Sequence, residues 1–204
     1  MKLKNFNKFL IGLVTISAFP ASIVFSNSST QIHSSFFVEN KATNDISWTI
    51  GDNGIIKPTD KTQIRGTIEI PSVWDGIPVT GIARFAFKDC TSLTNITFAE
   101  GIRLTSIAIG TFQNCSSLTS INISNSVTSI GDNAFNDCSS LKSVNFDNGS
   151  QLTSIGTHAF KNCNTLTSIN IPSGVTSIGD NAFADCSSLT DVTFNWNEEQ
   201  LKKL

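Results

Sequence analysis

A five-residue signature occurs five times in this 204-residue chain: alanine or threonine, then phenylalanine, then a cysteine three positions after the phenylalanine. The copies occupy positions 86–90, 111–115, 134–138, 159–163 and 182–186, so the step from one cysteine to the next alternates between 25 and 23. A unit of this length buries its apolar face only against a neighbouring unit. The regular period therefore predicts a repeat solenoid.

One repeat, residues 115–137, shows how each unit should fold. Residues 121–123 alternate as Ile-Asn-Ile, which predicts a short strand with both isoleucines facing inward. Residues 127–130 predict a second short extended piece, and 131–133 a turn that caps a short helical segment carrying Ala134 and Phe135. Stacking such units would place the apolar residues in continuous interior ladders, so function should be sought at outward positions.

A longer period, spanning two repeats, is also present, because residues 91–138 resemble 139–186 more closely than adjacent repeats resemble each other. In the longer repeats, phenylalanine (Phe98, Phe146) takes a strand position that isoleucine holds in the shorter ones. The longer repeats also carry two extra residues after that strand. We infer a duplicated repeat pair, with two bulged loops, around 100–101 and 148–149, projecting from one edge.

Residues 166–186 follow the pattern Leu-x-x-Ile-x-Ile-Pro-x-x-Val-x-x-Ile-Gly-x-x-Ala-Phe-x-x-Cys, which resembles the BspA-like leucine-rich repeats of the Treponema pallidum type. The resemblance extends over residues 66–195. It implies a leucine-rich-repeat horseshoe with a parallel β-sheet on the concave face and short extended and helical pieces on the convex side. It further implies a secreted or cell-surface protein that binds other macromolecules, often in adhesion. Ala108 and Thr111 depart from the pattern and predict a slightly distorted second unit.

Residues 1–26 predict a signal peptide, because three lysines precede a mostly apolar run over residues 10–24. Small residues follow, and cleavage is expected after Ser26 or, as a second choice, after Ala21. An uncleaved membrane anchor is the alternative, disfavoured because the run is short and interrupted. We therefore expect a secreted or cell-surface location, with no membrane insertion after cleavage.

The remaining boundaries follow from changes in regularity along the chain. Residues 27–44 are expected to be a flexible segment, 45–65 a β-rich N-terminal cap, 66–195 the leucine-rich repeat solenoid and 196–204 a short C-terminal cap. Asp75-Gly76 predicts a tight hairpin turn at the first unit. The net charge is −2 with 15% charged residues, so nucleic acid is not an expected partner.

The residues that usually carry chemistry have structural interpretations here. The five cysteines predict a free, buried ladder, with a disulfide as the weaker alternative for a secreted chain. Asp89, Asp137 and Asp185 precede cysteines, and although paired carboxylates serve in hydrolases, turn capping explains them better because Asn114 and Asn162 take the same column. His158 is expected to be a turn residue, and His33 lies in the flexible segment. No catalytic, metal or cofactor site is predicted.

The concave face is the candidate ligand-binding site. Its outward residues are small, polar and almost uncharged, and could serve as a hydrogen-bonding surface or simply as the solvated face of a solenoid. The central column is Thr97, Asn122, Asn145, Asn170 and Thr193, and the flanking column is Ser120, Ser143 and Ser168.

The sequence thus predicts a non-catalytic module that binds an extracellular protein or glycan. The alternative is a structural surface component that self-associates end to end.

Overall fold

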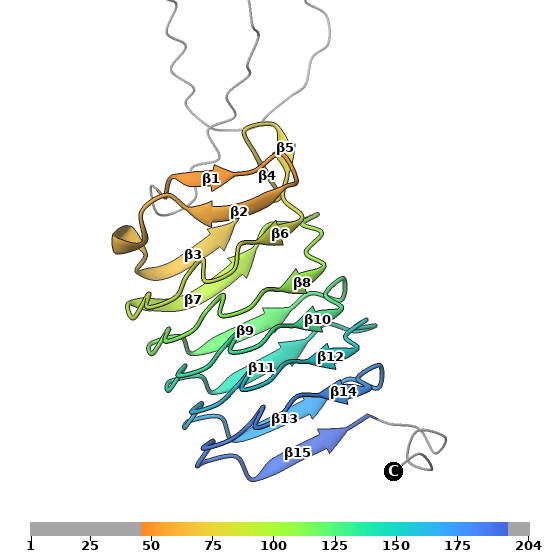
Figure 1. Cartoon of the computed structure of the whole chain (residues 1–204). Coiled ribbons are helices and arrows are strands. Elements are labelled where there is room, and N and C mark those ends of the chain that lie inside the picture. The colour runs from red at the N-terminus through yellow and green to blue at the C-terminus, as the bar shows by residue number, and fades with distance from the viewer. Residues whose placement is uncertain (1–45, 196–204) are drawn as a thin grey trace, which may run out of the picture. The chain divides into compact units, whose positions relative to one another are not determined.

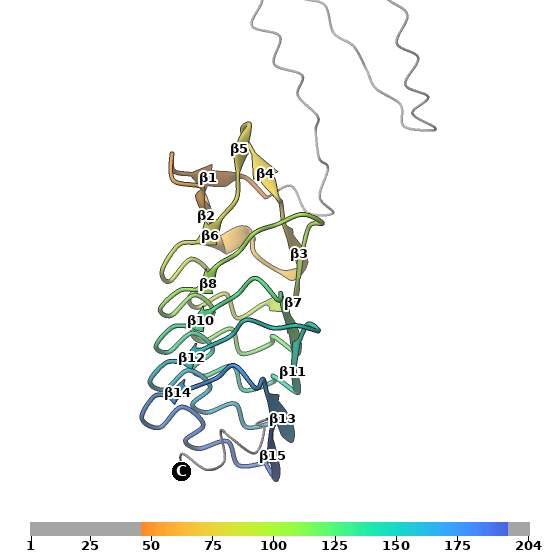
Figure 2. The ribbon, with the colours of Figure 1, turned by 90° about the vertical axis from the view of Figure 1, so that its right-hand side faces the viewer.

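The computed structural model describes residues 46–195 of the chain. The predicted signal peptide, flexible segment and C-terminal cap lie outside these residues. Within them the chain winds as a β-solenoid, with longer strands stacked on one side and shorter strands on the other (Figures 1 and 2). The fold class predicted from the repeat is thereby confirmed.

The described chain begins with a small β-rich region. Strand β1 (Trp48–Ile50) pairs antiparallel with β2 (Ile55–Pro58), and η1 (Lys61–Gln63), a single 3₁₀ turn, follows. β2 then pairs parallel with β6 (Gly81–Ile82), which links this region to the solenoid.

The predicted hairpin at Asp75-Gly76 is confirmed. It joins β4 (Val73–Trp74) to β5 (Ile77–Pro78) in antiparallel pairing. Asp75 and Gly76 have φ values of 50° and 74°, the left-handed conformation that a two-residue hairpin turn of type I′ requires.

Each repeat then adds one strand to each side of the solenoid. The longer strands are β3 (Gly66–Ile70), β7 (Leu93–Phe98), β9 (Ser120–Ile123), β11 (Ser143–Phe146), β13 (Ser168–Ile171) and β15 (Asp191–Phe194). The shorter strands are β8 (Ser106–Ile107), β10 (Ser129–Ile130), β12 (Ser154–Ile155) and β14 (Ser177–Ile178). All pairs within these two sets are parallel, and equivalent repeat positions face each other.

The core consists of the predicted apolar ladders. Phe87, Phe112, Phe135, Phe160 and Phe183 stack with ring centroids 5.1–5.3 Å apart and nearly parallel planes. Trp48 contacts the first of these rings edge-on, with centroids 6.0 Å apart, and so covers the N-terminal end of the ladder. Burying aromatic and aliphatic side chains is worth about 1.5–3 kcal/mol each, so these ladders dominate stability.

The helical pieces predicted on the convex side are turns in the structure. Asn133 and Asp137, with φ of 54° and 63°, flank residues 134–136, leaving too few right-handed residues for an α-helical turn. In addition, the Phe135 and Asp137 amides donate to carbonyls of the next repeat, at 2.7 and 2.9 Å, rather than along their own segment. The amides of this segment therefore alternate between bonds to the next repeat and local turn bonds, such as Ala134 N–H to the Gly131 carbonyl at 3.2 Å, and no run of helical bonds forms.

The distortion predicted for the second unit is not observed. Phe112 keeps a spacing of 5.3 Å to both neighbouring rings. Thr111 is fully buried, and its hydroxyl donates to the Ala108 carbonyl at 2.8 Å. Because this polar group is satisfied inside its own turn, threonine replaces alanine without disturbing the stack.

Candidate binding face

The predicted binding residues lie on the outer side of the longer strands, a surface called here the long-strand face. The central residues Thr97, Asn122, Asn145, Asn170 and Thr193 are all exposed. Two pairs of them are joined between layers: Asn145 Nδ2 donates to Asn122 Oδ1 at 3.0 Å, and Thr193 Oγ1 donates to Asn170 Oδ1 at 3.2 Å. The face is therefore a hydrogen-bonded surface organised in pairs of repeats.

On this face, strand interfaces with several paired residues alternate with interfaces that have one pair or none. We call the first kind closed and the second kind open. β9 and β11 are in register over four residue pairs, and so are β13 and β15. β7 and β9 share the single pair Asn95 and Ser120, and β11 and β13 belong to separate sheets. The two-repeat period of the sequence thus becomes an alternation of closed and open strand interfaces.

Two sequence features accompany the open interfaces. Phe98 and Phe146 end β7 and β11 and are partly exposed, whereas Ile123 and Ile171 at the same position in the other repeats are fully buried. At the closed interface the Asp147 amide donates to the Ile123 carbonyl at 3.0 Å. Pro172 occupies the equivalent position beside β11 and has no N–H to donate, so this bond cannot form there.

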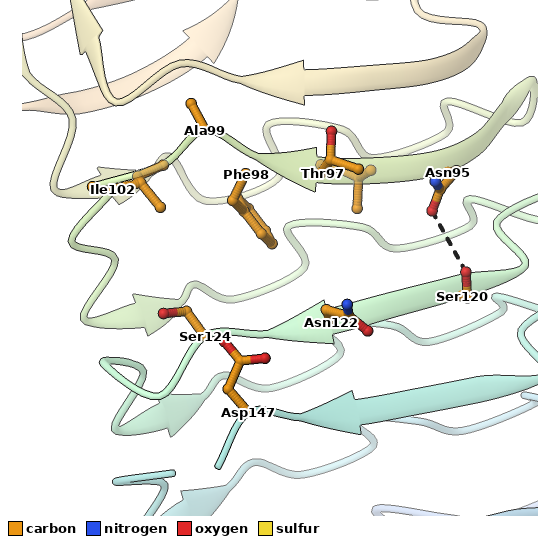
Figure 3. Close-up of a pocket in the computed structure, with 11 residues that line it drawn as sticks. Asn95, Thr97, Phe98, Ala99, Ile102, Ser120, Asn122, Ser124 and Asp147 are labelled. Atoms are coloured by element: carbon orange, nitrogen blue, oxygen red, sulfur yellow. Dashed lines mark hydrogen bonds between the residues drawn. The ribbon is translucent and has the colours of Figure 1, made fainter. Parts of the chain in front are cut away.

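A hollow of about 470 Å³ lies at the open interface between β7 and β9 (Figure 3). Phe98, Ile102, Thr97 and Asn122 line it, together with Asp147 from the next repeat. Gly101, at φ 79° in the bulged loop, also contributes to its wall. We call this the first hollow.

A second hollow of about 350 Å³ lies between β11 and β13. Its lining repeats that of the first at the equivalent positions two repeats later: Phe146 for Phe98, Asn145 for Thr97, Asn170 for Asn122 and Gly149 for Gly101. Asp147 lines both hollows. The duplicated repeat pair therefore builds the same concavity twice.

Five of the eight predicted site residues line one of the two hollows. Thr97, Ser120 and Asn122 line the first hollow, and Asn145 and Asn170 line the second. The described lining of the hollows does not include the other three, Ser143, Ser168 and Thr193.

The predicted site lacks Phe98 and Phe146, whereas Asp147 belongs to the outward flank that the sequence predicts for the same face. The signal for the two rings is present in the sequence, as the alternation of phenylalanine with isoleucine and the two bulged loops. Strand alternation, however, assigns to the core a residue two positions after an inward aliphatic residue, here Ile96 or Val144, and so places both rings in the interior.

The cysteines form a column of equivalent positions in successive repeats. Four of the five are buried. The thiols of Cys115, Cys138, Cys163 and Cys186 lie 3.0–3.3 Å from a phenylalanine carbonyl of the preceding repeat. Burial raises the pKa of Cys90 to about 11 and that of Cys138 to about 12, which disfavours the nucleophilic thiolate.

The aspartates that precede the cysteines act within turns. Asp89 and Asp137 have left-handed φ values of 66° and 63°, and each carboxylate accepts a hydrogen bond from the asparagine of the next repeat. Asn114 Nδ2 lies 2.9 Å from Asp89 Oδ1, and Asn162 Nδ2 lies 2.7 Å from Asp137 Oδ1. The alternation of aspartate and asparagine is thus a set of inter-repeat pairs.

Other functional signals are weak in the described part of the chain. His158 has a left-handed φ of 57°, in the same turn column as Asn133 and Asn181. Residues 46–195 contain no cluster of three metal-ligating side chains. Over the same residues, no helix is long and apolar enough to cross a membrane.

The stacked repeats, each with one longer and one shorter parallel strand and a leucine ladder in the core, define a leucine-rich repeat protein. The family model for the BspA type leucine rich repeat region matches six copies over residues 67–190. The chain therefore belongs to the BspA-type leucine-rich repeat family. Comparison with curated proteins finds no match.

Solved structures share the fold. A leucine-rich repeat protein from Bacteroides ovatus ATCC 8483 is 34% identical over 72% of this chain and 39% of its own, with a TM-score of 0.59. The T. pallidum leucine rich repeat protein TpLRR is 28% identical over 72% of this chain and 67% of its own, with a TM-score of 0.62. The pneumococcal vaccine antigen PcpA is 27% identical, over 66% and 31% of the two chains, with a TM-score of 0.55. This chain thus spans less than half of the Bacteroides and pneumococcal proteins.

Proposed function

We propose that this protein is a non-catalytic binding module that attaches to an extracellular macromolecule through its long-strand face. The observation that supports this most directly is the pair of equivalent hollows on that face, both lined by side chains that form hydrogen bonds. A rigid repeat scaffold holds such side chains at constant spacing, which suits recognition of a large partner.

The proposed location is outside the cell or at its surface. This proposal rests on the basic and apolar N-terminal segment, which has the order and length of a secretory signal. The proposed role, in adhesion or surface interaction, follows from the family resemblance together with this location. The described lining of the two hollows contains no lysine or arginine, which would be needed to bind nucleic acid, and this agrees with a role in surface interaction.

The proposal predicts that charge introduced along the central column abolishes partner binding. Asn122, Asn145 and Asn170 are exposed, so replacing all three with lysine should leave the chain folded while placing three cations across the hollows. Binding is measured by capture of partners from extracellular-matrix and cell-surface preparations, and folding by circular dichroism and thermal unfolding.

A matched control exists beside the shorter strands. Thr128, Thr153 and Thr176 are also exposed, one per repeat, and each hydroxyl donates to a backbone carbonyl of the preceding repeat. Replacing these three with lysine adds the same charge and should leave partner binding unchanged. Equal binding by both triple variants would contradict the assignment of function to the long-strand face.

Self-association along the solenoid axis is a second candidate. β14 and β15, the last described strands, leave Ile178 and Val192 exposed to 38% and 39%, whereas the equivalent residues Ile155 and Ile169 are buried. Sedimentation velocity over a hundredfold concentration range distinguishes the two candidates. Linear oligomers that grow with concentration support assembly, and a monomer throughout supports binding of a different molecule.

A further inference from the structure

The two hollows are copies of one subsite placed two repeats apart. Both lie at an open strand interface and are lined by a left-handed glycine of the following loop, Gly101 or Gly149. Both are lined by a partly exposed phenylalanine, Phe98 or Phe146. A repeated subsite suits a ligand that presents the same group at the same spacing, and so indicates a polymer with a regular repeat.

The spacing of the hollows limits the kind of polymer. Two layers of a parallel sheet measure about 9.6 Å, on the order of the length of one disaccharide in a β-1,4-linked hexose chain. An extended polypeptide presents side chains on one face about every 6.7 Å, which does not match. A polyproline II helix repeats about every 9.3 Å and does match. Spacing therefore leaves a polysaccharide and a proline-rich peptide.

The hydrogen-bonding groups favour the polysaccharide. The hydrogen bond from Asn145 Nδ2 to Asn122 Oδ1 orients both side-chain amides. The Asn122 amino group can then donate to a ligand in the first hollow, and the Asn145 oxygen can accept from a ligand in the second. The Asp147 carboxylate, which lines both hollows, only accepts when ionised. Sugar hydroxyls donate and accept, whereas a proline-rich chain has few N–H donors for such acceptors.

The charge of the hollows favours a neutral polymer. The described lining of either hollow contains no lysine or arginine, and Asp147 contributes a carboxylate to both. An anionic polysaccharide would place its carboxylates or sulfates near this aspartate without a compensating cation. The partly exposed rings of Phe98 and Phe146 supply apolar surface for the C–H face of a sugar ring.

From these observations, we infer that the paired hollows at β7–β9 and β11–β13 are two equivalent subsites for a neutral β-1,4-linked polysaccharide that runs along the solenoid axis. This inference rests on the proposed binding function and adds the chemical class of the ligand. Asp147, between the hollows, would accept hydrogen bonds from hydroxyls bound in either subsite.

The test uses the full chain with dimers and hexamers of β-1,4-linked glucose and of N-acetylglucosamine, measured by calorimetry and amide chemical shifts. One hexamer can occupy both subsites and a dimer only one, so at least one hexamer should bind on the order of tenfold or more tighter than its dimer. Phe98→Ile and Phe146→Ile each install the residue of the alternate repeats, and either should reduce hexamer affinity to that of the dimer. The double variant should bind neither.

Asp147→Asn tests the shared carboxylate, with Asp191→Asn as its control outside the described lining of both hollows. Asp147→Asn should weaken hexamer binding severalfold, and Asp191→Asn should not. Hexamers that bind no tighter than dimers, or that bind the double phenylalanine variant unchanged, would overturn the inference.

The failure of this inference is distinguishable from failure of the proposed function. If neither hexamer binds but a proline-rich peptide or a captured protein binds and is lost in the triple lysine variant, the long-strand face still functions in binding and the ligand class is wrong. If the triple lysine variant keeps every interaction of the wild type, the proposed function itself fails.

Discussion

At the scale of single residues, the turns between the two sheets depend on side chains that tolerate a left-handed backbone. Asp89, Asn114, Asp137, Asn162 and Asp185 all have φ between 58° and 66°. Asparagine and aspartate adopt this conformation more readily than other non-glycine residues. In the described repeats they also bond in pairs between layers, so the same residues set the turn geometry and join neighbouring repeats.

This double role predicts a measurable cost at Asp137. Asp137→Ala removes the 2.7 Å hydrogen bond to Asn162 and leaves alanine in the left-handed conformation. We expect a loss of about 1–3 kcal/mol in the free energy of unfolding, measured by urea denaturation.

The exchange Asp137→Asn with Asn162→Asp serves as the control. It keeps one carboxylate and one amide at the same two positions and should cost well under half as much. If the exchange and the alanine variant are equally destabilised, the inter-repeat pair is not the source of the effect.

At the scale of elements, ladders of stacked apolar side chains hold the solenoid together. A side chain in the middle of a ladder packs between two equivalent residues, whereas the last one packs against a single equivalent residue. Phe135 is fully buried between Phe112 and Phe160, whereas Phe183 follows Phe160 as the last ring and is partly exposed. The same substitution should therefore have different effects along one ladder.

Phe135→Leu and Phe183→Leu test this difference. Loss of ring contacts in a fully packed layer should cost about 1–2 kcal/mol at Phe135, and less than half of that at Phe183. Chemical denaturation of both variants gives the comparison. Equal losses would contradict the dependence of stability on position in the ladder.

At the scale of the whole molecule, the cysteine column couples stability to pH. Burial raises the pKa of Cys90 to about 11, that of Cys138 to about 12, and that of Cys115 as well, whereas an unfolded thiol titrates at about 8.5. Above that pH the unfolded chain binds fewer protons than the folded one. This contribution to stability should therefore be fully present below about pH 8.5 and be lost as the pH rises through the folded pKa values.

The measurement is the urea midpoint between pH 8 and 11 for the wild type and Cys138→Ala. The variant should show a shallower decline, because one titrating thiol is removed. Tyrosine, whose phenol ionises in this range, is absent from the chain and does not contribute. Parallel declines for the two proteins would show that the Cys138 thiol is not protected from ionisation.

Thiol titration of the unfolded, unreduced protein checks the same column independently. Five reactive thiols are expected if the ladder is free, and fewer would indicate a disulfide. In the folded protein the buried thiols should react far more slowly than after unfolding.

The sequence by itself determined the repeat, the interior ladders and the paired alternation. Spacing and strand periodicity decide which residues face inward, and both are local properties of the chain. The predicted column from Thr97 to Thr193 accordingly lies on one face. The turn around Ala134 and Phe135 was beyond local reasoning, because the Phe135 and Asp137 amides bond to carbonyls of the next repeat rather than within the segment.

Only the tertiary structure decided where the long-strand face opens. The hollows lie beside the partly exposed rings of Phe98 and Phe146. At the interface between β11 and β13, Pro172 also has no N–H for the carbonyl that ends β11. These are relations between residues more than twenty positions apart. The period predicted that layers would stack, whereas the strand pairing across each interface, which forms between distant residues, decides which pairs of layers close and which leave a hollow.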